Sequence, residues 1–358
     1  MTIRPVATGT ATASAVDGSQ PWPTPIEGYC DLKDFPFLSG ESLPELRIRY
    51  HTLGEPRLDA NGRTANAVLI MHGTGGTGEQ FLKDIFAGEL FNPGQPLDAD
   101  KYFIVLRDGI GHGKSSKPSD QLRAKFPKYG YRDMIAADYA LLTQGLGVNH
   151  LRLVMGTSMG GMQSWLWAGT YPNFVDAVMP LASLPTEIAG RNRMTRKAII
   201  DAITEDPKYD GGDYESQPVH GLKAALYSLT WMKSIPLQWQ EECPDRESAD
   251  TFLQNQISTA LRDADANDML YYVSASADYD PRPLLGEIKA PLLAINSADD
   301  QVNPPELGIL EEGIKKVAKG RSIVLPISNK TRGHGTHTYA ALWKDELVKL
   351  LEESGGVP

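Results

Sequence analysis

Short, wholly apolar runs that alternate with helix-like segments most constrain the fold of this chain. Residues 66–72, 101–108 and 150–156 are such runs, and an apolar run without alternation is typical of a strand buried on both faces of a sheet. Strands of this kind, separated by helices, predict a mostly parallel, doubly wound α/β sheet covered on both faces. The other segments that fit are a strand at 43–56, apolar runs at 290–297 and 321–328, and helices at 132–147 and 339–354.

The pattern lapses between residues 185 and 280, where helical periodicity continues without apolar, strand-like runs. An insertion of this kind predicts a helical cap, or lid, over the carboxyl ends of the strands. We therefore divide the chain into a core of residues 31–184 and 281–358 and a cap of residues 185–280. Residues 1–30 are rich in Ala, Thr, Ser, Gly and Pro, and we predict that they form a flexible lead.

The composition argues against two classes of protein. A formal net charge of −10 over 358 residues disfavours a nucleic-acid-binding protein, because basic side chains are needed to displace counterions from phosphates. No apolar run approaches the roughly 20 residues that span a bilayer, so we expect no membrane association. The lead lacks the apolar segment of a signal peptide, which leaves open a cytoplasmic protein or the trimmed form of a periplasmic or secreted one.

Metal-binding motifs are absent from the sequence. It contains neither CxxC nor HExxH, so we predict no metal site and no bound cofactor. The two cysteines, Cys30 and Cys243, lie far apart in the sequence, and unpaired thiols are favoured over a disulfide.

The sequence GTSMG at residues 156–160 matches the G-x-S-x-G nucleophile elbow. In such an elbow a serine sits where a strand turns sharply into a helix, and a Cβ atom on either glycine would collide with the tight turn. An apolar run precedes Ser158 and a helix-like segment follows it. We therefore predict that Ser158 is a nucleophile. The alternative is a glycine-rich turn that holds an incidental serine.

A serine hydroxyl needs a base, and the chain order expected with this elbow is serine, acid, histidine. Three histidines follow Ser158, and the first of them, His220, lies in the predicted cap. His334 lies in a glycine-flanked loop between a predicted strand and the last predicted helix, where a catalytic imidazole is needed. We predict that His334 is the base and that His337, at the start of the helix, has a supporting role.

Asp299 and Asp300 follow a predicted strand and are candidates for the acid that orients the imidazole. Asp300 stands four residues before Pro304, an arrangement common where the triad acid leaves its strand. We therefore predict that Asp300 is the acid. Asp299 is then expected to face solvent or to cap the following helix.

An oxyanion that forms on the substrate needs two backbone donors. The residue after the nucleophile, Met159, supplies one. The glycine-rich loop at residues 69–81 supplies the other, with Gly73 and Thr74 as candidates. This loop lacks the Lys-Ser/Thr pair of a phosphate-binding P-loop, which disfavours that alternative.

The cap contains candidates for substrate binding. Arg191 and Arg193 lie in a basic run at residues 190–197 and are candidates to bind a carboxylate or a coenzyme A phosphate. The alternative for this run is a solvated helix face. Trp231 and Tyr271 are candidates for an apolar acyl pocket, and packing within the cap is the alternative for both.

Several motifs together resemble the homoserine O-acetyltransferase branch of the α/β-hydrolase superfamily. They are NAVLIMHGTGG, FNPGQPLDADKYFIV, GTSMGGMQSWLWAGTYP, DYDP and DDQVNPPE, and the resemblance covers residues 43–350. It implies an α/β-hydrolase fold and a triad of Ser158, Asp300 and His334. It also implies a helical lid, which in many members builds a homodimer.

The sequence departs from the acetyltransferase pattern at two places. Acetyltransferases of this branch follow the histidine with an aspartate that helps to hold the amino group of homoserine, but residue 335 here is glycine. Their oxyanion loop reads HALTG, whereas this chain has HGTGG, as in ordinary esterases. We therefore predict a serine ester hydrolase whose partner is a small-molecule ester. The alternatives are an O-acyltransferase that uses acetyl-CoA and, disfavoured by the intact triad, a non-catalytic binding module.

Overall fold

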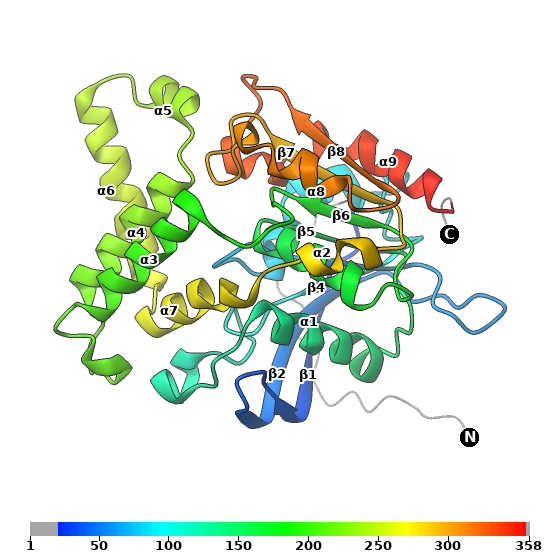
Figure 1. The fold of residues 1–358 in the computed structure, drawn as a ribbon, viewed down its shortest axis with the longest axis horizontal. Helices are drawn as coiled ribbons and strands as arrows, with labels where there is room; N and C mark the ends of the chain where they lie inside the picture. The colour runs from blue at the N-terminus through cyan, green and yellow to red at the C-terminus, as the bar shows by residue number, and fades with distance from the viewer. Residues whose placement is uncertain (1–20, 356–358) are drawn as a thin grey trace.

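A central sheet of eight strands organises residues 21–355, the part of the chain that the computed structural model describes. The strand order is β1-β2-β4-β3-β5-β6-β7-β8 (Figure 1). The pairs β1–β2 and β2–β4 are antiparallel and all other neighbours are parallel. The strands are β1 (Ile26–Pro36), β2 (Ser42–Leu53), β3 (Ala67–Met71), β4 (Phe103–Arg107), β5 (Leu153–Thr157), β6 (Val178–Leu181), β7 (Leu292–Ser297) and β8 (Gly320–Leu325).

The predicted mostly parallel α/β sheet is confirmed, and every strand predicted from an apolar or alternating run is present. The sequence pattern misses two strands, β1 and β6. β1 is an edge strand in which six of the eleven residues are exposed, and β6 has only four residues, one of them Pro180. Because β1 begins at Ile26, the last residues of the predicted lead 1–30 belong to the sheet. Residues 1–20 of the lead lie outside the described part of the chain.

Helices cover both faces of the sheet, and alternate residues of β3 reach each face. Leu69 and Met71 share a hydrophobic core with α1 and α2, whereas Val68 and Ile70 share a second core with α9. Since all four side chains are fully buried, β3 shows no alternation between apolar and polar residues. These helices are α1 (Tyr131–Ala140), α2 (Met159–Thr170) and α9 (Lys344–Glu353), with the short α8 (Ile309–Ile314) beside β8.

The cap is a layer of helices at one end of the sheet, on the left in Figure 1. A third hydrophobic core, which includes Ile199, Ile203, Leu222 and Met269, lies inside this layer. Its helices all fall within the predicted range 185–280, although the periodicity does not predict α5. The homodimer through the cap stays a prediction. The cap helices are α3 (Gly190–Thr204), α4 (Val219–Met232), α5 (Pro236–Glu242), α6 (Arg246–Asp263) and α7 (Ala266–Ser274).

The described residues 21–355 contain no membrane-spanning helix, no disulfide and no cluster of metal-binding side chains. No helix in this range is long and apolar enough to cross a bilayer. Cys30 and Cys243 are both free thiols, as the sequence favours. Over the same range, no group of three or more His, Cys, Asp or Glu side chains is arranged to hold a metal ion.

Replacing Leu69 with alanine should strongly destabilise the fold. The side chain is fully buried in the central strand β3, and Leu→Ala at such sites costs about 2–5 kcal/mol. Urea denaturation followed by circular dichroism measures this loss. Leu58→Ala is the matched control, because Leu58 is 64% exposed and its truncation should cost about 0.5 kcal/mol or less. Equal losses at the two sites would contradict a core centred on β3.

Candidate active site

Ser158 stands on a sharp turn between β5 and α2. Its φ of 56° and ψ of −110° lie in a region that residues other than glycine rarely adopt. A Cβ atom on Gly156 would lie 2.3 Å from the backbone of Gly160. A Cβ atom on Gly160 would lie 2.0 Å from the carbonyl oxygen of Met71, in β3. The turn therefore requires both glycines, for the steric reason that the sequence motif predicts.

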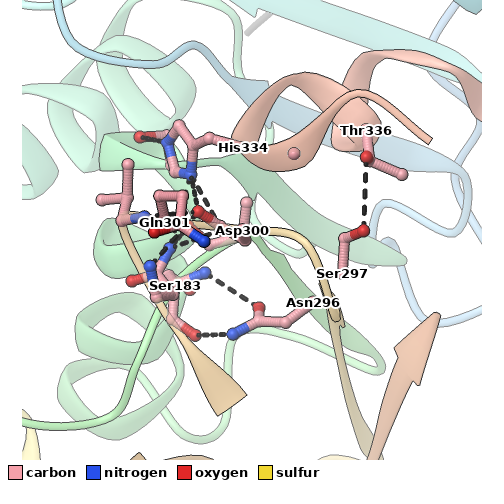
Figure 2. Close-up of polar contacts among 12 residues, drawn as sticks. Ser183, Asn296, Ser297, Asp300, Gln301, His334 and Thr336 are labelled. Atoms are coloured by element: carbon pink, nitrogen blue, oxygen red, sulfur yellow. Dashed lines mark hydrogen bonds and ion pairs between the residues drawn. The ribbon is translucent and has the colours of Figure 1, made fainter. Parts of the chain in front are cut away.

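His334 links Ser158 to Asp300. Its Nε2 lies 2.7 Å from the Ser158 Oγ. Its Nδ1 lies 2.9 Å from an Asp300 carboxylate oxygen, a contact drawn in Figure 2. The predicted glycine-flanked loop that carries the imidazole includes a short helical turn, Gly333–Thr338. His334 therefore lies within hydrogen-bonding distance of both Ser158 and Asp300, the two other residues of the predicted triad.

The Asp300 carboxylate is buried and accepts several hydrogen bonds. The backbone N–H groups of Val302 and Asn303 donate to it at 2.7 and 3.2 Å, and the Asn303 side-chain amide donates at 3.0 Å. Burial acts to raise the pKa of Asp300, but the His334 imidazole and these donors outweigh burial and lower the pKa below its ordinary value. An ionised Asp300 accepts the Nδ1 proton of His334, which leaves Nε2 as the acceptor for the Ser158 hydroxyl.

Asp299 does not face solvent or cap a helix as predicted. Its half-buried carboxylate accepts hydrogen bonds from the Thr331 hydroxyl at 2.8 Å and from the Gly333 N–H at 3.0 Å. The Ser297 hydroxyl also donates to it. Since Gly333 directly precedes His334, Asp299 ties the segment that carries the imidazole to the end of β7.

Polar contacts beside the triad join the ends of β6 and β7 to the helical turn of His334 (Figure 2). The Asn296 side chain accepts from the Ser183 N–H at 3.1 Å and donates to the Ser183 carbonyl at 3.3 Å. The Thr336 hydroxyl lies 3.4 Å from the Ser297 hydroxyl. Such contacts between short side chains and distant partners leave no spacing pattern, so the sequence does not predict them.

The glycine-rich loop after β3 lies against the nucleophile. A Cβ atom on Gly73 would lie 3.3 Å from the Ser158 Cβ, so the Gly73–Thr74 backbone passes close to the serine. Across the described residues, no carbonyl or side chain accepts a hydrogen bond from the Thr74 N–H. Met159 is the first residue of α2, where the N–H groups have no partner inside the helix. The predicted oxyanion donors thus lie beside Ser158 and are free to bind a ligand.

His72 holds this loop in place. Its Nε2 accepts the Gly109 N–H at 2.9 Å, so its Nδ1 carries the proton that is donated to the Gly73 carbonyl at 2.8 Å. Burial, with the nearby Arg107 and His112 charges, lowers the pKa of His72 well below its ordinary value. The neutral ring therefore keeps both hydrogen bonds across the neutral pH range.

A cavity of about 340 Å³ opens at Ser158 between the sheet edge and the cap. The charged side chains in its wall are Lys83, Arg196 and Lys233, and none of the described residues that line it is Asp or Glu. Its apolar cap side consists of Ile199, Leu229, Met232 and Val273. The cavity therefore combines an apolar wall with an excess of positive charge.

The four predicted substrate-binding residues lie outside the wall of this cavity. Arg191 and Arg193 are exposed, and Arg191 donates to the Gln301 carbonyl at 2.8 Å. Trp231 is exposed, whereas Tyr271 is buried and donates to the Phe126 carbonyl at 2.6 Å. The alternatives, a solvated helix face and packing within the cap, describe these positions better than a binding role does.

Comparison with known proteins identifies the family. The family described as alpha/beta hydrolase fold matches residues 66–315. This chain belongs to the α/β-hydrolase family. The homoserine O-acetyltransferase of Pasteurella multocida is 31% identical over 302 residues, which cover 74% of this chain and 80% of that protein. This α/β-hydrolase therefore lies in the branch that its motifs resemble.

Solved structures of esterases and acetyltransferases share this fold. Esterase E22 matches with a TM-score of 0.79 and 20% identity, covering 91% of this chain and 99% of that chain. The homoserine O-acetyltransferase of Bacillus anthracis matches with a TM-score of 0.78 and 22% identity, covering 93% and 98%. At these identities the likeness shows the α/β-hydrolase fold, and it does not separate hydrolysis from acyl transfer.

Three cationic residues of the cavity wall are absent from the predicted binding residues of this α/β-hydrolase: Lys83, Arg196 and Lys233. Arg196 lies within the basic run 190–197, beside the two arginines that were predicted. It is buried, its Nε donates to Asn192 at 3.0 Å, and its Nη1 lies 3.3 Å from the Val273 carbonyl and 3.2 Å from the Ser276 hydroxyl. A signal was available: Arg196 lies three residues before Ile199, so helical spacing puts both on one buried face of α3.

His337 lies beside the catalytic candidate His334. The two rings are 5.4 Å apart, centroid to centroid, and in an edge-to-face arrangement. Burial, together with the nearby charges of His334 and Lys233, lowers the pKa of His337 to about 3. His337 therefore stays neutral in the wall of the cavity and does not compete with His334 for the proton of Ser158.

Replacing Asp299 with alanine should destabilise the His334 segment. The Thr331 hydroxyl and the Gly333 N–H lose their acceptor, and leaving a buried donor unpaired costs about 1–3 kcal/mol. We expect ester turnover to fall by about tenfold or more, because the imidazole is less well positioned. Urea denaturation and kcat measure the two effects. Asp250→Ala, on the exposed surface of α6, is the control. Equal changes of stability and kcat in the two variants would refute the role of Asp299 in holding the segment of His334.

The neutral His337 should make the fold sensitive to mild acid. Between its folded pKa of about 3 and the unfolded value of about 6.5, the unfolded chain binds more protons at this site. The free energy of unfolding therefore falls as the pH drops through this window, by up to about 1.4 kcal/mol per pH unit. Urea denaturation at several pH values between about 6 and 4 measures this dependence. In His337→Gln the free energy of unfolding should fall less steeply with decreasing pH than in the wild type. An unchanged slope would contradict a neutral, buried His337.

Proposed function

We propose that this α/β-hydrolase is a serine ester hydrolase that acts on a small acyl ester through an acyl-enzyme. The charge of the cavity carries the proposal: Lys83, Arg196 and Lys233 line it, and no carboxylate does among the described residues. An amino-acid acceptor such as homoserine can place its carboxylate at these cations, but its ammonium group then lies beside them without an acidic partner, which disfavours binding. Water needs no such partner, so hydrolysis is favoured.

In the first half-reaction, the Ser158 Oγ attacks the acyl carbonyl carbon while its proton moves to the His334 Nε2. The carbonyl electron pair moves to oxygen, where the N–H groups of Thr74 and Met159 stabilise the oxyanion. Collapse of this intermediate restores the carbonyl and breaks the bond to the alcohol. The alcohol oxygen leaves with the proton of His334, and the acyl group stays on Ser158.

In the second half-reaction, His334 takes a proton from water, and the water oxygen attacks the acyl carbon. The same backbone donors stabilise the second oxyanion. Its collapse breaks the bond to the Ser158 Oγ, which takes the proton back from His334. One ester and one water thus yield one acid and one alcohol, and the enzyme returns to its starting state. Throughout, the ionised Asp300 stabilises the imidazolium.

Gly335 supports the same conclusion. An ideal Cβ at this position would be 3.7 Å from the nearest neighbouring atom, the Arg332 Cβ, and its φ is not in the left-handed region. Packing therefore does not require glycine directly after His334. The resemblance to acetyltransferases implies an aspartate there for the amino group of homoserine, and this chain lacks that carboxylate.

An O-acyltransferase that uses acetyl-CoA is the alternative. Relatives such as the Pasteurella multocida homoserine O-acetyltransferase favour it, and the cations of the cavity would suit a phosphate. A hydrolase and an acyltransferase share the formation of the acyl-enzyme and differ in the nucleophile that takes the acyl group from Ser158. The choice therefore depends on the second half-reaction alone.

A comparison of two assays tests the proposal. We expect the kcat/KM for hydrolysis of p-nitrophenyl acetate to exceed that for acetyl transfer from acetyl-CoA to homoserine by about tenfold or more. Ser158→Ala should lower ester hydrolysis by about 10⁴-fold or more, whereas Ser39→Ala, at an exposed serine, should have no effect. Acetyl transfer that outpaces hydrolysis would favour the alternative, and full activity without the Ser158 hydroxyl would exclude both.

A further inference from the structure

We propose that the substrate is an ester that carries an anionic group such as a carboxylate, and that Lys233 selects it. This inference rests on the ester hydrolase function proposed above and names its substrate class. It starts from one imbalance: the cavity that contains Ser158 has three cationic side chains in its wall and no acidic one among its described lining residues.

Lys233 directly follows the last residue of α4 and lines the cavity. Its Nζ makes no hydrogen bond or ion pair with another described residue. The residue is exposed, but the protein around it partly desolvates the ammonium group and lowers its pKa. An anionic ligand in the cavity would give this unpaired cation a partner of opposite charge.

Lys233 is also close enough to the reacting groups to act on a small substrate. Its charge contributes to the low pKa of His337, whose ring lies 5.4 Å from that of His334. Lys233 and Ser158 also line the same cavity of about 340 Å³, so a small ester bound there can contact both the Lys233 ammonium group and the Ser158 Oγ.

The two other cations of the wall differ from Lys233. The Nε and Nη1 of Arg196 already donate hydrogen bonds to Asn192, Val273 and Ser276. Lys83 is exposed, and its Nζ has no partner among the described residues, so it adds to the positive field at the cavity without a fixed contact. Lys233 is also exposed and unpaired among the described residues, but its charge, unlike that of Lys83, acts on His337 beside His334. Lys233 is therefore the unpaired cation that an anionic substrate can reach nearest the reacting groups.

Two pairs of esters test the proposal on the full-length protein. The carboxylate lies on the acyl side in mono-p-nitrophenyl succinate and on the alcohol side in para-acetoxybenzoate, and the methyl ester of each is its neutral partner. In one pair we expect the anionic member to have a kcat/KM about tenfold or more above that of the neutral member, as for one hydrogen bond between charged groups. The pair that shows the preference identifies the side that carries the charge.

Variants of Lys233 then assign the preference. Lys233→Gln should bring the ratio of anionic to neutral kcat/KM close to one, and Lys233→Arg should retain most of it. Lys316→Gln, at an exposed lysine outside the cavity, is the matched control and should leave the ratio unchanged. Rising salt concentration should also lower the ratio in the wild type.

The outcomes separate the two proposals. Hydrolysis of both neutral esters at least as fast as of their anionic partners would refute the anionic substrate and leave the ester hydrolase standing. A clear preference for an anionic ester that survives in Lys233→Gln would refute the role of Lys233. Failure to hydrolyse any of the four esters would instead count against the hydrolase function itself.

Discussion

The parallel pairing of β3, β5, β7 and β8 decides where chemistry can occur in this α/β-hydrolase. Parallel strands end at the same edge of a sheet, and the loops that follow them meet there. The loops after these strands carry Thr74, Ser158, Asp300 and His334, which lie far apart in the sequence. The sheet therefore brings these residues to one edge, and contacts within the loops set their final positions to within a few ångströms.

Fixing those last ångströms has a cost in stability. The left-handed φ of Ser158 stores strain of about 1–3 kcal/mol, and Asp300 holds its charge in the protein interior. The surroundings offset both. The glycines beside Ser158 remove the steric clash, while Asn303 donates to Asp300 and also anchors itself on the Ala182 carbonyl at 2.8 Å. Asp299 holds the segment before His334 by accepting hydrogen bonds from Thr331 and Gly333. The site is thus held by residues that do not react.

The parts of this molecule that the sequence predicts are those with a repeating or local signature. Fully apolar runs predict the buried strands, and the spacing of GTSMG predicts the turn at Ser158. The edge strand β1 escapes prediction because solvent, rather than the core, faces most of its side chains. Their positive charge predicts a binding role for Arg191 and Arg193, but the face of α3 that lines the cavity is the one that carries the buried Ile199. Asn303 and Asp299 act through contacts across the fold, which single-chain spacing cannot reveal.

The net charge of the chain and the charge of the cavity have opposite signs. A net charge of −10 describes the whole surface and argues against binding to polyanions, yet the cavity at Ser158 is lined by cations alone among its charged described residues. Water and salt screen the charges on the outer surface, whereas the low-dielectric walls of the cavity strengthen the field of the cations inside it. A small anionic ester would therefore be repelled weakly by the distant surface and attracted strongly at short range. The same field would oppose a substrate with an ammonium group. The sign of the local charge, rather than that of the chain, is what discriminates between an acidic ester and an amino-acid acceptor.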